Sequence, residues 1–105
     1  MANKSSIFKL EMLILNVLKN GDCYGYQLNK QLKSDVQGKI TITDGNMYNI
    51  LYRLLDNGYI SCYDKRVDKK IRVYYHLEPS GELYLKELVD EFDSVVRLIQ
   101  DLIHP

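Results

Sequence analysis

The sequence predicts a single α+β domain that is mainly α-helical, and three observations support this fold class. The chain has 105 residues, 46% of them hydrophobic and 27% charged, which is enough for one hydrophobic core. Apolar residues recur at helical spacing in four segments. Two further segments, on either side of a basic run, alternate with a period of two, which is typical of β-strands.

The first predicted helix covers residues 7–18. We expect Ser6 to cap its N-terminus and Gly21 to stop it. Phe8 and two further apolar residues widen the apolar arc, which predicts burial on two sides. The main stripe recurs three and four positions apart: Ile7, Leu10, Ile14, Val17 and Leu18.

A shorter second helix is predicted over residues 26–33, where Leu28 and Leu32 lie one turn apart. Residues 34–39 then read as a loop. Residues 40–42 read Ile-Thr-Ile, a β-branched run that predicts one short strand.

The third helix has the clearest pattern in the chain. Thr43 or Asp44 can cap it, and Asn57 and Gly58 can end it. Its apolar stripe consists of Met47, Ile50, Leu51, Leu54 and Leu55. The opposite face is polar and contains Gly45, Asn46, Tyr48, Asn49, Tyr52, Arg53 and Asp56. We expect this polar face to contact a ligand.

Residues 60–63 and 73–77 form two predicted strands around a hairpin. Asp68 can start the turn, but no glycine is present to take a positive φ, so the turn type stays open. The hairpin contains five basic residues: Lys65, Arg66, Lys69, Lys70 and Arg72. Such a cluster suits a phosphate backbone. Charge alone, however, favours a solvated turn over a phosphate-binding site.

The formal net charge of zero conceals a segregation of charge along the chain. Residues 1–39 contain six lysines and three acids, whereas residues 82–105 contain six acids and two basic residues. An acidic C-terminal segment repels polyanions, so it would leave the basic hairpin as the surface that attracts them.

The last predicted helix follows Pro79, which is suited to a first turn. Over residues 82–103 it would be about 33 Å long, more than the rest of the chain can cover. We therefore expect a homodimer built by the last helix together with the first helix, including Phe8. Residues 79–105 would form the dimerisation helix, as one compact unit with residues 1–78. The predicted contact residues follow a heptad-like stripe: Leu85, Leu88, Val89, Phe92, Val95, Val96, Ile99, Leu102 and Ile103.

Several function classes find no support. The longest apolar run, residues 12–15, is too short for a membrane helix, and residues 1–6 lack an apolar leader, so we expect a soluble cytoplasmic protein with no membrane partner. Cys23 and Cys62 form no CxxC motif, and we expect both to be small buried hydrophobic residues rather than metal ligands or disulfide partners. No catalytic constellation or nucleotide-binding loop is present, so neither an enzyme nor a cofactor is predicted.

The order helix, helix, strand, helix, strand, basic turn, strand, long helix is that of a winged helix-turn-helix. The major groove of double-stranded DNA admits one helix, where Asn suits adenine and Arg suits guanine. A cationic hairpin, the wing, can lie on the adjacent backbone or enter the minor groove. We therefore expect residues 1–78 to be a winged helix-turn-helix DNA-binding domain.

Three stretches, between residues 13 and 85, resemble the PadR-family transcriptional regulators. The first is Tyr24-Gly25-Tyr26-Gln27-Leu28. Residues 45–60 are similar to the family pattern G-x-[apolar]-Y-x-x-L-x-R-L-x-x-x-G-[apolar]-I. Residues 72–77 with Gly81 are similar to R-x-Y-Y-x-L-T-x-x-G, except that Glu78 replaces the common Thr. The wing also lacks the family's frequent glycine.

The resemblance implies a dimeric regulator, here expected to be a repressor, that binds a pseudo-palindromic operator. The DNA contacts would come from Tyr24, Asn46, Tyr48, Asn49, Tyr52 and Arg53 and from the five wing bases. The resemblance also implies a small aromatic effector at the dimer interface, where Phe8 and Phe92 are candidate residues, although Phe residues at helical spacing are more often part of the core.

Three alternatives stay open. Arg53 is the only cation of the third helix, with Asp44 and Asp56 at its ends, so the domain could instead bind a protein. Arg53 could also simply pair with one of those two acids. Electrostatic RNA binding is a weaker alternative. Tyr59 and Tyr75 are expected in the packing, and His76 on the outer face of its strand.

Overall fold

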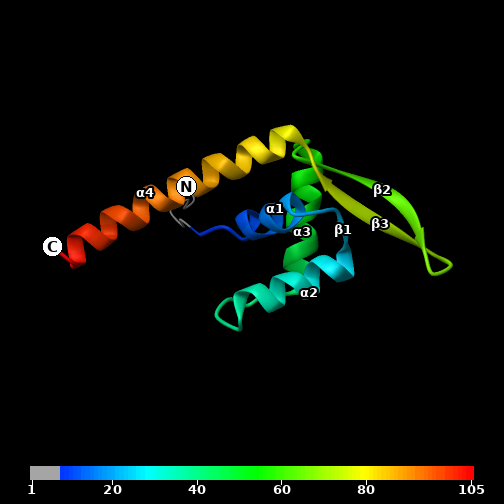
Figure 1. The fold of residues 1–105 in the computed structure, drawn as a ribbon, viewed down its shortest axis with the longest axis horizontal. Coiled ribbons are helices and arrows are strands. Elements are labelled where there is room, and N and C mark those ends of the chain that lie inside the picture. The colour runs from blue at the N-terminus through cyan, green and yellow to red at the C-terminus, as the bar shows by residue number, and fades with distance from the viewer. Residues whose placement is uncertain (1–7) are drawn as a thin grey trace.

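The computed structural model describes residues 8–105, and the predicted fold class is confirmed: four helices and a three-stranded antiparallel sheet form a winged helix-turn-helix (Figure 1). The strands lie in the order β1-β3-β2. The elements are α1 (Leu10–Lys19), β1 (Cys23–Tyr24), α2 (Gly25–Val36), α3 (Asp44–Asp56), β2 (Ile60–Val67), β3 (Lys70–Leu77) and α4 (Pro79–Ile103).

Helix α1 lies at the centre of the core because its apolar arc contacts partners on two sides, as predicted. Ile14 and Leu15 of α1 are completely buried. Full burial of one such side chain contributes about 1.5–3 kcal/mol. The other fully buried large side chains come from α2 and α3: Leu28, Leu32, Met47, Leu51 and Leu54.

Helix α1 begins at Leu10, three residues later than predicted, after an extended Lys9 that forms no side-chain cap. Glu11 occupies the first turn, where a carboxylate is favoured by the helix dipole. Phe8 precedes the helix and packs against the core. The proposed cap Ser6, and Ile7, lie outside the described residues.

Helix α2 is longer than predicted and reaches Val36, so residues 34–36 are helical rather than loop. It ends where Gln37 and then Gly38 adopt left-handed φ values of 52° and 76°. The predicted strand at residues 40–42 is wrong. Ile42 is buried in the core, and the first strand is instead the pair Cys23–Tyr24, which lies beside the free edge of β3.

Helix α3 confirms the predicted caps. The Thr43 hydroxyl accepts a hydrogen bond from the Asn46 backbone amide at 3.2 Å, and the helix ends at Asp56 before a left-handed Gly58. Its buried side includes Met47, Ile50 and Leu51. The polar side therefore faces outward.

The hairpin of β2 and β3 closes with a two-residue turn, since Val67 pairs with Lys70. Asp68 and Lys69 both adopt left-handed φ values, 51° and 69°. A type I′ turn requires this at both central positions, so the chain forms the turn without the usual glycine.

Helix α4 starts with Pro79 at its first turn, packs its N-terminal half along α1 and projects its C-terminal half away from the domain (Figure 1). Gly81 allows the first turn of α4 to lie close to Tyr59, because a Cβ at residue 81 would overlap the Tyr59 carbonyl oxygen. The molecule extends 58 × 29 × 27 Å. Among residues 8–105, no helix has the length and apolar character needed to cross a membrane.

Candidate nucleic-acid interface

The outer face of α3 is open to solvent. Asn46, Asn49, Tyr52 and Arg53 are all exposed, while Met47 on the other side is fully buried. Short amides and a guanidinium on a solvent-facing helix offer hydrogen-bond donors and acceptors of the kind that read base edges. The geometry thus leaves this helix free to enter a groove.

Arg53 forms an ion pair that the sequence did not predict. Its Nη1 lies 3.8 Å from the Glu11 Oε2 of α1, and the Tyr84 hydroxyl donates a hydrogen bond to the same oxygen at 3.4 Å. The predicted alternatives Asp44 and Asp56 are not its partners, and Asp44 instead accepts a hydrogen bond from Asn29. The Glu11 side chain is only 13% exposed and that of Arg53 is 61% exposed. The guanidinium is therefore tethered on one side and accessible on the other.

Tyr48 positions α2 against α3. Its side chain is half-buried, and a Cβ at Gly25 would overlap its hydroxyl, so the glycine permits the close approach of the two helices. The ring of Tyr48 lies 6.3 Å from that of Tyr52, which is exposed. Of these two tyrosines, Tyr52 presents the larger surface to a ligand.

The sheet face directed away from the core holds an aromatic and cationic cluster, the tyrosine cluster: Tyr24, Tyr63, Tyr74, Lys65 and Arg72. The Tyr74 ring lies 5.4 Å from Tyr24 and 5.6 Å from Tyr63, and these neighbours leave it 8% exposed. Lys65 Nζ lies 5.0 Å above the Tyr74 ring, and the Arg72 guanidinium lies 4.7 Å above Tyr24. Of the five predicted wing cations, Arg72 thus also holds the wing against β1, whereas Lys65 contacts an aromatic ring within the hairpin itself.

The remaining three wing cations lie at the tip or on the other face. Alternation along the strands places Arg66 opposite Ile71, on the face away from Lys65 and Arg72. Arg66, Lys69 and Lys70 are exposed, and within residues 8–105 they take part in no ion pair or ring contact. They are the wing charges most available to phosphates.

A hydrogen-bonded triad of Asp22, Tyr63 and His76 links the turn after α1 to the sheet, and sequence reasoning missed it. His76 Nδ1 lies 2.8 Å from Asp22 Oδ1, and the Tyr63 hydroxyl donates to Asp22 Oδ2 at 2.7 Å. The hydrogen bond to Asp22 raises the pKa of His76. Desolvation would raise the pKa of Asp22, but the bonds from His76 and Tyr63 lower it. Only the register of β1 beside β3 could have indicated this contact.

The two cysteines differ from the expectation of burial. Cys62 is exposed and Cys23 is half-buried, and both are free thiols. Cys62 pairs across the sheet with the buried Tyr75 and so lies on the core-side face of β2. Burial, followed by the charge of Asp22, raises the pKa of the Cys23 thiol. No group of three or more potential metal-ligating side chains occurs within residues 8–105.

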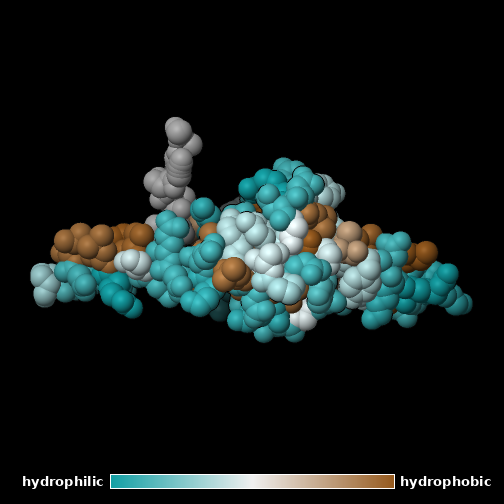
Figure 2. Space-filling view, turned by 90° about the horizontal axis from the view of Figure 1, so that it is seen from above, coloured by the Kyte–Doolittle hydropathy of each residue, from teal (hydrophilic) through white to brown (hydrophobic). Residues whose placement is uncertain are grey.

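The predicted dimerisation residues fall into two groups along α4. Leu85 and Leu88 are buried in the core of their own chain, and Phe8, Val89 and Phe92 pack against that core. Val95 and Val96 are half-buried. The exposed apolar residues of the projecting half are Leu98, Ile99, Leu102 and Ile103. Figure 2 shows hydrophobic side chains along one side of this half and hydrophilic side chains along the other.

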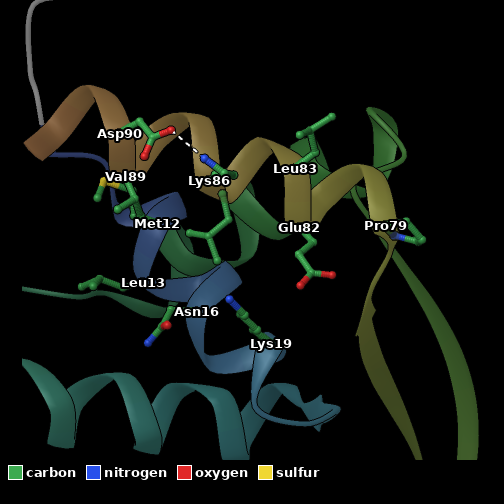
Figure 3. Close-up of a pocket in the computed structure, with 11 residues that line it drawn as sticks. Met12, Leu13, Asn16, Lys19, Pro79, Glu82, Leu83, Lys86, Val89 and Asp90 are labelled. Atoms are coloured by element: carbon green, nitrogen blue, oxygen red, sulfur yellow. Dashed lines mark hydrogen bonds and ion pairs between the residues drawn. The ribbon is translucent and has the colours of Figure 1, made fainter. Parts of the chain in front are cut away.

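A groove of about 710 Å³ runs between α1 and α4 (Figure 3). Met12 and Leu13 line it from α1, and Leu83 and Val89 line it from α4. On α4, Lys86 pairs with Asp90 at 3.1 Å. The groove is therefore mainly apolar with charged residues beside it.

Comparisons with known proteins agree with this geometry. The profile described as "Transcriptional regulator PadR-like family" matches residues 14–87. A relative from Lysinibacillus sphaericus, "Uncharacterized protein X", is 30% identical over 91 residues, which cover 86% of this chain and 84% of the relative. The structure of a transcriptional regulator from Clostridium thermocellum, Cth-833, has a TM-score of 0.80 at 30% identity, covering 88% of this chain and 90% of that chain. Bacillus subtilis PadR in complex with operator DNA has a TM-score of 0.68 at 25% identity, covering 76% of this chain and 46% of that chain.

Proposed function

This chain belongs to the PadR-like family of transcriptional regulators, and from that premise we propose that it represses transcription as a homodimer bound to a pseudo-palindromic operator. The observation on which the proposal depends is the exposed polar face of α3 beside a cationic wing. In a symmetric dimer, two such helices would enter successive major grooves about 34 Å apart.

Base reading is assigned to the exposed side of α3. Asn46 and Asn49 can bond adenine edges, and Arg53 can bond guanine. Arg66, Lys69 and Lys70 would neutralise phosphates, and Tyr52 can donate a hydrogen bond to a phosphate oxygen. The structural likeness to Bacillus subtilis PadR, whose structure contains operator DNA, supports this assignment.

The homodimer is assigned to residues 79–105, the dimerisation helix, with residues 1–78 as the DNA-binding domain. Ile99, Leu102 and Ile103 are 44%, 70% and 64% exposed on one side of α4. A single chain gains nothing from this exposed stripe, whereas a second copy would bury it. The α1–α4 groove offers further apolar surface for the partner.

We place the small aromatic effector that the family resemblance implies in the α1–α4 groove. Its apolar walls include Met12, Leu13 and Val89. Phe8 and Phe92, the candidates from sequence, pack against the core instead. Repression itself needs only that the dimer occupy its operator, since occupancy blocks access to the same DNA.

Selection of bound fragments from genomic DNA at two salt concentrations tests the proposal. We expect recovered fragments to share an inverted repeat with half-sites about one helical turn apart. On a recovered duplex, the double variant Lys69→Ala and Lys70→Ala should reduce the slope of log affinity against log salt by about two units. Recovery of unrelated fragments in proportion to their abundance would contradict sequence-specific binding, and an unchanged slope would remove the wing from the interface.

A further inference from the structure

The hairpin presents an exposed isoleucine that neither the core nor phosphate binding explains. Ile71 is 64% exposed, and it pairs across the hairpin with Arg66, so both side chains lie on the same face of the wing. Val73 follows on that face and is 43% exposed. In Figure 2 hydrophobic surface lies among hydrophilic side chains at the end of the molecule where the hairpin lies.

This face of the wing is the one turned toward α2 and α3. Ile71 and Val73 line a recess of about 330 Å³ together with Tyr26 and Tyr48. Ile71 belongs to the first cross-strand pair beyond Val67 and Lys70, which close the turn. At about 3.4 Å per residue it lies about 7 Å behind the tip, and its side chain stands roughly perpendicular to the sheet. When the hairpin lies along the minor groove with this face inward, the Ile71 side chain is therefore an apolar group that enters the groove.

The charges around Ile71 identify its partner. Arg66 lies opposite, Lys69 and Lys70 precede it, and all three are exposed. An apolar side chain framed by cations complements a surface with apolar walls between two rows of anions. The minor groove has this character, since deoxyribose walls separate its phosphate strands.

We propose that Ile71 enters the minor groove beside the α3 site and selects A·T base pairs there, an inference that rests on the DNA binding proposed above. In the minor groove, guanine presents an exocyclic amino donor that A·T pairs lack. An isoleucine side chain would strip water from that donor and offer no acceptor in return, which is costly. A·T pairs present no such donor, so an apolar contact there leaves no amino group without a hydrogen-bond partner.

The test uses a duplex recovered by the selection described above. Each A·T pair flanking the major-groove contacts is replaced in turn by G·C and by inosine·C, which has the minor-groove pattern of A·T because inosine lacks the amino group. At the positions under the wing, wild type should lose about five- to ten-fold in affinity with G·C, the lower end of a typical mismatch effect, and little with inosine·C.

Ile71→Thr and Ile71→Val form the matched pair of variants, because both are β-branched and nearly equal in shape. The hydroxyl introduced by Ile71→Thr can accept a hydrogen bond from the guanine amino group. The loss of affinity on G·C replacement should therefore fall below two-fold in Ile71→Thr, whereas Ile71→Val should keep the wild-type loss. The salt slope should stay unchanged in both, since no charge is altered. An equal G·C penalty in wild type and Ile71→Thr, or an equal penalty for inosine·C and G·C, would overturn the role of Ile71. Loss of sequence preference in wild type itself would overturn the proposed function instead.

Discussion

At the scale of single residues, Arg53 is held by an ion pair but remains largely exposed to solvent. Its ion pair with Glu11 is long, at 3.8 Å, and its side chain is 61% exposed, so the pair stabilises the fold only weakly. The nearly buried carboxylate nevertheless restricts where the guanidinium can lie. A base-reading residue benefits from such pre-orientation, because less rotamer entropy is lost on binding.

Two variants distinguish the ion pair of Arg53 with Glu11 from a direct contact of Arg53 with DNA. Arg53→Ala should weaken binding to the selected duplex by about 1–3 kcal/mol and relax the preference at one position. Glu11→Gln removes the charge of the partner but keeps Arg53, so it should leave that positional preference in place. Affinity measured on the selected duplex and its single-position variants checks both. An equal loss for Arg53→Ala on unrelated DNA would identify a backbone contact.

The pair of Asp22 and His76 predicts a pH-dependent contribution to stability. The pKa of His76 is raised by its hydrogen bond to Asp22, so the contribution is fully present below the ordinary value of 6.5 and is lost as pH rises through the folded-state pKa. The pKa of Asp22 is lowered in the folded state, so its own contribution is present above the ordinary value of 3.8 and is lost only as pH falls through the lowered pKa.

A double-mutant cycle with Asp22→Asn and His76→Gln measures this contribution. The coupling free energy of unfolding should be largest near pH 5.5 and decline toward pH 8.5. Because the two side chains are 32% and 48% exposed, it should stay below about 1 kcal/mol. A coupling that is constant across this pH range would show that protonation of His76 does not contribute.

At the scale of elements, the wing turn forms with residues that disfavour its backbone. Asp68 and Lys69 adopt φ values of 51° and 69°, which cost a residue with a Cβ about 1 kcal/mol or more. Glycine takes the same conformation without that cost. The lysine at the second turn position is therefore a compromise between backbone conformation and charge.

Lys69→Gly should show both sides of this compromise. We expect the free energy of unfolding to rise by about 1 kcal/mol, while the salt slope of DNA binding falls by about one unit. Lys70→Ala is the control, because it removes a cation from a strand position and so lowers the slope without raising stability. A destabilised Lys69→Gly protein would contradict the assigned source of strain.

The limits of sequence prediction also appear at the element scale. Helix α3 was predicted with its caps because each end carries a local signal, the Thr43 hydroxyl and the Asn57-Gly58 pair. Strand β1 was missed because two residues have no periodicity, and only pairing with β3 makes Cys23–Tyr24 a strand. The Ile-Thr-Ile run at residues 40–42 has the β-branched composition of a strand but forms none: Ile42 is buried in the core, Ile40 packs against it, and within residues 8–105 no strand pairs with them.

The same distinction between local sequence signals and long-range contacts applies to the candidate site. The outward face of α3 follows from its periodicity, and its exposed residues Asn46, Asn49 and Arg53 lie where the pattern predicts. The division of the wing cations between two faces, and the contact of Arg53 with Glu11, depend on strand register and on helix packing. Both involve residues far apart in the chain, which local patterns do not encode.

At the scale of the whole molecule, α4 gives the chain its elongated shape of 58 × 29 × 27 Å. The N-terminal half of the helix shares the core through Leu85 and Leu88, so it is fixed to the DNA-binding domain. The C-terminal half extends beyond the domain with an apolar side exposed (Figures 1 and 2). A dimer formed through this half would fix the spacing of two α3 helices, because each α4 is rigidly joined to its own domain.

Leu102→Lys tests this arrangement better than a substitution at Phe92, which packs against the core of its own chain and would also destabilise the monomer. Leu102 is 70% exposed, so its replacement should leave the unfolding of a single chain within about 0.5 kcal/mol. Sedimentation velocity should then find monomers at concentrations where wild type is dimeric. Affinity for the inverted repeat should fall at least ten-fold, because two linked half-site contacts become independent.

Arg97→Glu provides the control, since helical spacing places this exposed residue on the side of α4 opposite Leu102. Like Leu102→Lys, it changes the charge of the projecting half of α4, yet the protein should remain dimeric with unchanged half-site spacing. A dimeric Leu102→Lys protein would move the interface off the projecting half of α4. Monomers with undiminished affinity for the inverted repeat would break the link between dimerisation and operator recognition, because each domain would then bind its half-site without help from the other.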